Sequence, residues 1–191
     1  MTPESVIEAF RAAGALLEGH FLYTSGRHGR RFLQAARVLQ YPEHTDRLCA
    51  ALADRFKADG VELVVGPATG GIVLAYATAR CLGARAAYTE KDEEGGMALK
   101  RGFSLKPGTR VLVVEDITTT GGSVKKSIAH LRARGTHVVG VGVLIDRSGG
   151  EAAFDCRFEP LASLTMESWP PEDCPLCAQG HRLIEPDDII V

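Results

Sequence analysis

Two adjacent carboxylates and a run of small hydroxyl residues stand together at one turn of the chain. Glu115 and Asp116 follow the apolar run VLVV at 111–114, and TTTGGS at 118–123 comes directly before a helical pattern. Like charges held side by side repel, which a purely structural turn would not require, and such a pair suits sugar hydroxyls or a hydrated cation. Small residues at a helix start let several backbone amides converge on one phosphate. The turn therefore predicts a site for a phosphorylated ribose.

The elements that must position this turn alternate between strands and helices. In order, the pattern predicts a strand at 61–65, a helix at 72–81, strands at 84–88 and 110–114, a helix at 123–134 and a strand at 137–145. This alternation implies a parallel α/β sheet with right-handed crossovers. Ligands bind such sheets at the carboxyl ends of the strands, where Glu115 and Asp116 stand. The segment 20–37 instead looks irregular, apart from a short strand at Phe32 and Leu33.

Other interpretations of the turn explain less of it. An ordinary strand-to-helix turn capped by Ser123 accounts for the hydroxyl residues but not for two abutting acids. A P-loop is excluded because the chain contains no GxxxxGK[ST]. A dinucleotide site is poorly supported because neither 66–71 nor 140–142 supplies GxGxxG after a strand.

Length and charge limit the class of protein. The chain has 191 residues, 45% of them hydrophobic, with 22 basic against 24 acidic residues and a formal net charge of −2. This predicts one globular domain and gives no bulk electrostatic reason to bind nucleic acid or an anionic membrane. The apolar run 138–145 is too short to span a bilayer, and the start MTPESVIEAF carries acid where a signal peptide requires base. We therefore expect a cytoplasmic protein.

The composition also points to growth temperature. The chain has sixteen arginines, six lysines and no asparagine, a pattern compatible with a heat-adapted source.

Four segments together resemble a known family. VLVVEDITTTGGS at 111–123 resembles the signature with which type I phosphoribosyltransferases bind phosphoribosyl pyrophosphate (PRPP). FLYTSGRHGRRFLQ at 21–34, GPATGGI at 66–72 and LIDRS at 144–148 are similar to segments of orotate phosphoribosyltransferases, in particular their short thermophile-type form. The order and spacing of these segments fit across nearly the whole chain.

The resemblance implies a fold and a division of the chain. The fold is the type I phosphoribosyltransferase fold, an α/β architecture whose central, mostly parallel sheet is flanked by helices. We expect residues 1–191 to form one domain. Its core spans about 42–147, and the segments 1–41 and 148–191 form a small hood.

The resemblance also implies an activity: transfer of the phosphoribosyl group from PRPP to orotate, giving orotidine 5′-monophosphate and pyrophosphate in pyrimidine biosynthesis. Asp116, Glu115 and Lys91 are then catalytic. Besides the two acids, the PRPP-binding residues are Ile117, Thr118, Thr119, Thr120, Gly121, Gly122, Ser123, Thr69, Gly70, Lys100 and Arg101. The orotate-binding residues are Thr119, Arg147 and Phe32. Mg²⁺ is expected mainly through PRPP, without metal ligands from the protein, and the partners are PRPP, orotate and a second copy of the chain, with no nucleic acid and no membrane.

A chemical argument that does not use the resemblance also indicates Arg147 as a residue that binds orotate. Orotate carries a planar carboxylate, and a guanidinium at the end of a strand can meet it with paired hydrogen bonds. A surface arginine paired with the adjacent Asp146 explains its position equally well.

The pyrophosphate side departs from the family pattern. Many members carry lysine where 23–24 read YT here, and an aromatic-lysine pair where 69–70 read TG. The segment EKDEEGGMALKRG at 90–102 has no core pattern and is interpreted as a charged loop that closes over the site. Its available cations, for which a solvated charged loop is an equally good explanation, are Lys91, Lys100 and Arg101.

Cys174 and Cys177 form a CxxC pair that resembles half of a zinc site. The obvious completion, by Cys156 and His181, follows no spacing rule, and a redox pair or two plain thiols are open alternatives. A structural zinc ion at this pair is an alternative that the sequence leaves open but does not favour.

Two other functions stay open on the sequence. A phosphoribosyltransferase for a purine or for uracil would use the same ribose turn. A PRPP-sensing regulator that binds nucleic acid would use the basic cluster Arg27, Arg30, Arg31 and Arg37, although such a cluster is more often a solvated surface and the overall acidity opposes it.

Overall fold

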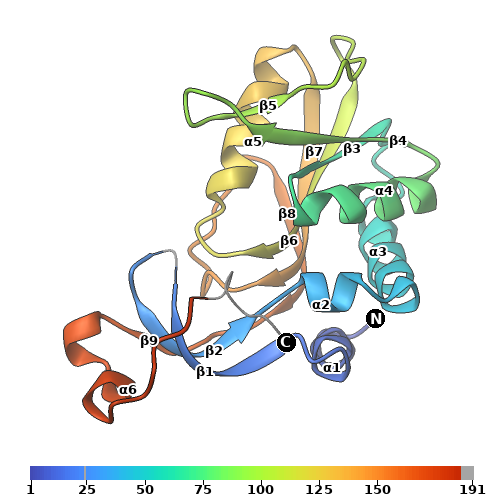
Figure 1. Ribbon diagram of the computed structural model, residues 1–191. Helices are drawn as coiled ribbons and strands as arrows, with labels where there is room; N and C mark the ends of the chain where they lie inside the picture. The colour runs from blue at the N-terminus through green and yellow to red at the C-terminus, as the bar shows by residue number, and fades with distance from the viewer. Residues whose placement is uncertain (24, 186–191) are drawn as a thin grey trace.

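The computed structural model describes residues 1–23 and 25–185, and its core is a six-stranded sheet between two layers of helices (Figure 1). The strands lie in the order β5-β4-β3-β6-β7-β8, and all are parallel except the edge strand β5. Their bounds are β3 Leu63–Pro67, β4 Arg85–Lys91, β5 Met97–Leu99, β6 Arg110–Thr118, β7 His137–Asp146 and β8 Arg157–Ser163. The predicted fold class, a mostly parallel sheet flanked by helices, is confirmed.

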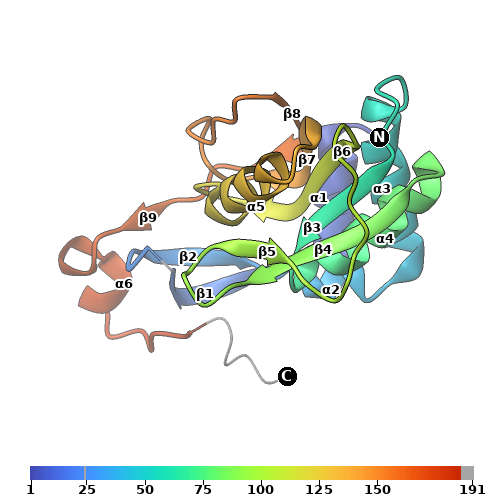
Figure 2. The same ribbon diagram turned by 90° about the horizontal axis from the view of Figure 1, so that it is seen from above.

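Helices cover both faces of the sheet because strand residues alternate between the faces. On β6, Leu112 and Val114 belong to the larger buried cluster, and Val111 and Val113 belong to the cluster built on α5. The helices are α1 Pro3–Ala12, α2 Ala36–Leu39, α3 Pro42–Phe56, α4 Gly70–Leu82 and α5 Gly122–Ala133. Figure 2 shows α5 on one side of the sheet and α3 and α4 on the other. None of the described helices combines the length and apolar character needed to cross a membrane.

The strand order brings two glycine-bearing turns together. From β3 the chain crosses through α4 to β4 on one side, and from β6 it crosses through α5 to β7 on the other side. Since β3 and β6 are parallel neighbours, the sheet has a topological switch point between them. A crevice forms at such a point, at the carboxyl ends of the strands. Here its walls are the turns that follow β3 and β6.

A separate three-stranded sheet forms the hood. Strands β1 (Leu16–Leu22) and β2 (His28–Leu33) pair as an antiparallel hairpin, and β9 (Ser168–Trp169) adds to β2. The tail continues through a 3₁₀ turn at Pro171–Asp173 and the short helix α6 (Pro175–Ala178).

Three segments differ from what the sequence predicted. The segment 20–37 is not irregular, because its strands complete the hairpin of the hood. The boundary of the hood also lies elsewhere: α1 and β8 belong to the core, since Val6 and Phe10 are fully buried in it and β8 pairs with β7. Within 90–102 the chain is not a bare loop, because β5 pairs with β4 and Met97 is buried.

Gly66 allows α4 to pack directly on β3. An added Cβ there would overlap the backbone carbonyl group of Gly71 at the start of α4, and a backbone cannot swing aside as a side chain can. We expect Gly66→Ala to cost about 3 kcal/mol of folding stability and to lower the melting temperature by roughly 10 °C, as followed by circular dichroism. Gly122→Ala, whose Cβ would make only ordinary contacts, is the control. An unchanged melting curve for Gly66→Ala would contradict this packing.

Candidate active site

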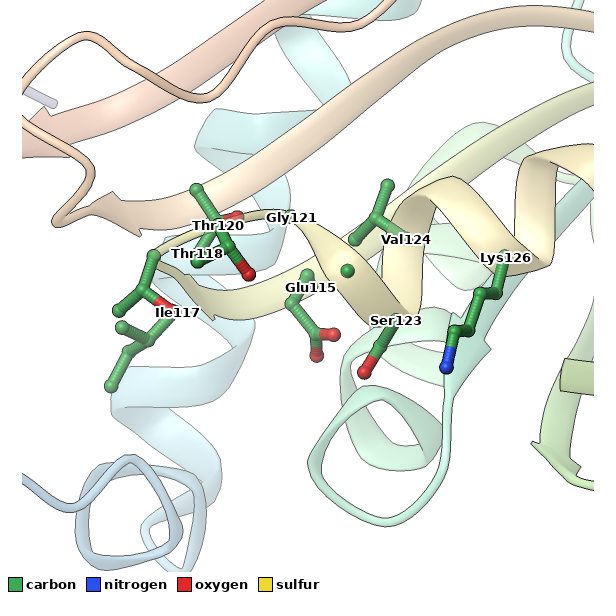
Figure 3. A pocket seen from close by; sticks show the side chains of 10 residues that line it. Glu115, Ile117, Thr118, Thr120, Gly121, Ser123, Val124 and Lys126 are labelled. Carbon is green, nitrogen blue, oxygen red and sulfur yellow. The ribbon is translucent and has the colours of Figure 1, made fainter. Parts of the chain in front are cut away.

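Glu115 and Asp116 stand at the carboxyl end of β6 and face different walls of the crevice. The Glu115 carboxylate lines a pocket of about 300 Å³ at the start of α5 (Figure 3). Asp116 lies against Gly70 on the turn after β3, so closely that an added Cβ on Gly70 would overlap Asp116 Oδ2. Both side chains are half-buried. Each accepts a backbone hydrogen bond: Asp116 N donates to Glu115 Oε1 at 3.3 Å, and Ile117 N donates to Asp116 Oδ1 at 2.6 Å.

Burial makes it unfavourable for both carboxyl groups of this pair to ionise. Desolvation, and then the negative charge of Asp116, raise the pKa of Glu115 to about 8. Desolvation also raises the pKa of Asp116, although backbone amide hydrogen bonds oppose it. The pair as a whole therefore retains a proton near neutral pH. A ligand that donates hydrogen bonds or brings positive charge favours the fully ionised pair, and sugar hydroxyls and hydrated cations are such ligands.

The turn between β6 and α5 forms the floor of the first pocket. The lining residues are Glu115, Ile117, Thr118, Thr119, Thr120, Gly121, Gly122, Ser123, Val124 and Lys126. Gly121 has a φ of +72° and packs against the Phe154 ring, so only glycine fits there. Because α5 is 12 residues long and begins at this turn, its first amides and its dipole favour an anion. Among the described residues, the buried Thr118 hydroxyl has no hydrogen-bond partner, and it also lines this pocket.

Lys126 is a cation of this pocket that sequence reasoning missed. It stands four residues after Gly122 on α5, so both lie on the same helix face, and that spacing was the available signal. Its Nζ donates to the carbonyl oxygen of Gly95 at 2.6 Å. Lys126 therefore connects the pocket to the turn between β4 and β5.

The three cations predicted for the 90–102 segment do not line this pocket in the described conformation. Arg101 forms a two-point ion pair with Glu90, with both N–O distances 2.8 Å. Lys100 Nζ donates to the carbonyl oxygen of Lys91 at 2.7 Å. These contacts stay within the β4–β5 hairpin. The other predicted pyrophosphate contacts, Thr69 and Gly70, do lie at the crevice, because Gly70 touches Asp116.

A second pocket, of about 570 Å³, lies between the hood and the ends of β6 and β7. It brings together the three residues predicted for orotate, Phe32, Thr119 and Arg147. It shares Ile117, Thr119 and Thr120 with the first pocket, so the two pockets adjoin. The lining residues that the sequence did not single out are Leu22, Tyr23, Ser25, Leu33, Ser148, Glu151, Met166 and Ser168. Thr24, where the chain departs from the family pattern, is outside the described residues.

Arg147 is held in this pocket by an aromatic ring. Its Cζ lies 5.1 Å from the centre of the Tyr23 ring, and its buried Nε has no hydrogen-bond partner among the described residues. Burial lowers the pKa of Arg147, and Tyr23 opposes that shift. The carboxylate of Asp146, the alternative partner, instead accepts a hydrogen bond from Ser148 N at 2.8 Å. The guanidinium therefore offers N–H groups to a planar anion.

Three of the four arginines in the basic cluster that could serve as a nucleic-acid surface are bonded within the chain. Arg27 donates to the hydroxyl and carbonyl oxygens of Ser168 at 2.9 and 2.6 Å. Arg31 pairs with Glu18 at 3.6 Å, and Arg37 donates to a backbone carbonyl at 3.1 Å. These contacts favour a structural role for the three arginines.

The fold, together with the acid pair and the hydroxyl-glycine turn at the end of β6, is that of a phosphoribosyltransferase. The sequence model of the phosphoribosyl transferase domain matches residues 36–156, and the chain belongs to this family.

Relatives narrow the class further. The orotate phosphoribosyltransferase of Desulforamulus reducens is 50% identical over 186 residues, 97% of each chain. That of Thermus thermophilus is 49% identical over 94% of this chain and 98% of its own length. The crystal structure of the Aeropyrum pernix orotate phosphoribosyltransferase has a TM-score of 0.68 at 28% identity, covering 83% of this chain and 93% of that one. Within the family the chain therefore belongs with the orotate phosphoribosyltransferases, which confirms the resemblance found in its sequence.

The raised pKa of Glu115 predicts that Glu115→Gln stabilises the fold at alkaline pH. An acid with a raised folded-state pKa binds more protons when folded than when unfolded, so stability falls as pH rises between the two pKa values. For Glu115 that window begins at about 4.3, the unfolded value, and ends at about 8. Glutamine removes the penalty, so the melting temperature of the parent should fall relative to Glu115→Gln across the window.

Thermal melts in a series of buffers measure this difference. Glu93→Gln, which removes one exposed acid from the β4–β5 turn, is the control and should follow the parent. Parallel pH profiles for the parent and Glu115→Gln would contradict the raised pKa.

Proposed function

We propose that the protein transfers the phosphoribosyl group of PRPP to orotate, forming orotidine 5′-monophosphate and pyrophosphate in pyrimidine biosynthesis. The observation that carries the proposal is the junction of the two pockets at Ile117, Thr119 and Thr120. A phosphate-binding turn with an acid pair lies on one side of this junction, and Arg147 lies on the other. Substrates bound on the two sides meet there, as group transfer requires.

The first pocket suits the ribose 5-phosphate part of PRPP. Amides and hydroxyls of residues 118–123 donate to the 5′-phosphate at the start of α5. The Glu115 and Asp116 carboxylates accept hydrogen bonds from the ribose hydroxyls, which favours the ionised form that burial disfavours. Thr69 and Gly70 belong on the pyrophosphate side, since Gly70 adjoins Asp116.

The second pocket suits orotate rather than a neutral base. The Arg147 guanidinium can pair with the orotate carboxylate while the Tyr23 ring supports it. Phe32 offers an apolar ring to the planar base, and Thr119 lies at the boundary with the sugar. Uracil and purines lack the carboxylate and would leave Arg147 without a partner in a half-buried pocket. This observation favours orotate over the alternative bases.

The reaction breaks the bond between C1 and the pyrophosphate oxygen and forms the bond between C1 and the orotate ring nitrogen. Positive charge develops on the sugar as pyrophosphate leaves. Glu115 and Asp116 lie where they can offset that charge, and the turn before α5 fixes the sugar by its phosphate. The ring nitrogen can lose its proton before the reaction, so the site needs no strong base.

Mg²⁺ fits this site as a companion of PRPP. The two carboxylates can accept a hydrated cation, but within residues 1–23 and 25–185 no group of three or more acidic, histidine or cysteine ligands gathers around them. Bound through PRPP, Mg²⁺ would neutralise the pyrophosphate as it leaves.

Several finer points belong to the same proposal. The three cations of the 90–102 segment would contact pyrophosphate when the β4–β5 hairpin closes over the site, or in the site of a second copy of the chain. These cations are Lys91, Lys100 and Arg101. A homodimer, a cytoplasmic location and a heat-adapted source stay predictions.

A competition among bases tests the function. The protein is mixed with PRPP, Mg²⁺ and equal amounts of orotate, uracil, adenine, guanine and hypoxanthine, and chromatography follows each base. We expect only orotate to be consumed. Consumption of another base in its place, or of no base, would overturn the assignment.

Arg147→Lys tests the orotate pocket separately. Lysine keeps the charge but loses the planar two-point contact, so the KM for orotate should rise by roughly 100-fold. The KM for PRPP should stay nearly unchanged, because PRPP occupies the other pocket. Arg47→Lys, on an exposed position of α3, is the matched control. Equal KM values for orotate in the parent and Arg147→Lys would contradict the pairing.

A further inference from the structure

The hood contains four metal-ligand side chains that the proposed function does not use. His20 and His28 come from the β1–β2 hairpin, and Cys174 and Cys177 come from the tail at α6. Figures 1 and 2 both show α6 beside the turn end of the hairpin. One ligand atom from each residue lies within 4.8 Å of all the others. The two histidines and Cys174 are buried, and Cys177 is exposed.

Four of the six distances between the ligand atoms are close to those of a tetrahedral site with two nitrogen and two sulfur ligands. His20 Nε2 and His28 Nδ1 are 3.1 Å apart. Cys174 Sγ lies 3.5 Å and Cys177 Sγ 3.7 Å from His20 Nε2, and Cys177 Sγ lies 3.2 Å from His28 Nδ1. Around a zinc ion with ordinary bond lengths, tetrahedral geometry separates two nitrogens by about 3.3 Å and a nitrogen from a sulfur by about 3.6 Å.

The other nitrogen of His20 is already bonded in the way that metal ligands usually are. His20 Nδ1 lies 2.9 Å from the carbonyl oxygen of His181 and donates to it. That bond fixes the tautomer, so the lone pair of Nε2 points toward His28 and the two cysteines. His181, which the sequence offered as one possible ligand, therefore contributes its backbone carbonyl, and the two histidines of the hairpin lie at the ligand positions. Cys156, the other possible ligand that the sequence offered, packs against the buried cluster on α5.

The CxxC turn brings both sulfurs to one side. Pro175 opens the single turn of α6, in which Ala178 N donates to the carbonyl oxygen of Cys174 at 3.2 Å. Gly180 N then donates to the carbonyl oxygen of Cys177 at 2.9 Å and closes the turn. Two thiolates three residues apart can thus reach the same ion, as in structural zinc sites with this spacing.

We propose that His20 Nε2, His28 Nδ1, Cys174 Sγ and Cys177 Sγ bind one Zn²⁺ ion in a closed structural site. The two cysteine thiols lose their protons to solvent on binding, and the two thiolates balance the charge of the ion. Two sulfur and two nitrogen ligands in a tetrahedral arrangement select zinc over magnesium or calcium. With four protein ligands the site leaves no position for a substrate, so its role is to hold the hood together.

A cross-link at this place would stabilise the hood. After β8, the described tail buries few apolar side chains, of which Leu176 is the largest, and β9 pairs with β2 at only two positions. The ion would join this tail to the hairpin. His20 and His28 also flank the turn that presents Tyr23 to Arg147, so the ion would fix the base of that turn. The site itself does not depend on the proposed function, because metal content is measured without any substrate.

Metal analysis of the intact chain tests the proposal. The protein is purified untagged, without chelator or added metal, and its zinc content is measured by mass spectrometry. We expect about one zinc per chain, release of that zinc by a mercurial reagent that captures thiolates, and a lower melting temperature after release. Protein exchanged into Co²⁺ should show the intense visible bands of a tetrahedral site and a thiolate charge-transfer band.

Matched variants locate the ion. Cys177→Ser and His28→Gln should each lose most of the zinc and the cobalt bands, whereas Cys81→Ser, which changes an exposed cysteine on α4, should keep both. Circular dichroism shows whether each variant is folded, and the cobalt and thiol assays on the parent do not depend on any variant. Parent protein that holds no zinc and takes up neither Zn²⁺ nor Co²⁺ would overturn the proposal. So would full zinc content in Cys177→Ser, or a Cys174–Cys177 disulfide in freshly purified protein.

Discussion

The free-energy cost of ionising both Glu115 and Asp116, half-buried side by side at the end of β6, is the constraint on which the rest of the site depends. Four fully buried residues before them anchor β6 within the sheet, so the chain cannot move the acids out into solvent. Adjacent strand positions then turn one carboxylate to each wall of the switch-point crevice. The pair is most stable with hydrogen-bond donors or a cation beside it. Without such a partner the pair keeps a proton near neutral pH, because burial raises the pKa of both carboxyl groups.

Sequence patterns revealed this part of the molecule because they are local. The run VLVV predicted a buried strand, and the hydroxyl-glycine run predicted a helix start. Their order placed the two acids at the carboxyl end of that strand. The same reasoning found Arg147 after β7, although position alone left Asp146 as an equal partner for it. That Phe32 lies in the same pocket as Arg147 was implied only by the family resemblance, since no periodicity connects two residues so far apart in the chain.

The hairpin inside the predicted hood and the strand β5 escaped prediction because contacts distant in the sequence define them. Strand β5 has its Leu99 amide bonded to His130 Nε2 on α5, a partner that no local pattern reveals. His20 and His28 meet Cys174 and Cys177 about 150 residues later, while the sequence suggested only the nearer His181 and Cys156. The place of Tyr23 beside Arg147 was missed for the same reason, because the two residues are far apart in the sequence. The Tyr23 ring lies across β2 at Gly29, where an added Cβ would overlap the Tyr23 hydroxyl.

The bond between Arg147 N and the carbonyl oxygen of Thr118, 2.8 Å long, links the ends of two neighbouring strands. Neighbouring strands in any sheet lie about 4.8 Å apart. The main chain therefore fixes the separation between the end of β6, which carries the acid pair, and the end of β7, which carries Arg147, whatever side chains surround them. Substitutions at the second-pocket residues that the first pocket does not share would then change the acceptor preference while this backbone spacing stays the same.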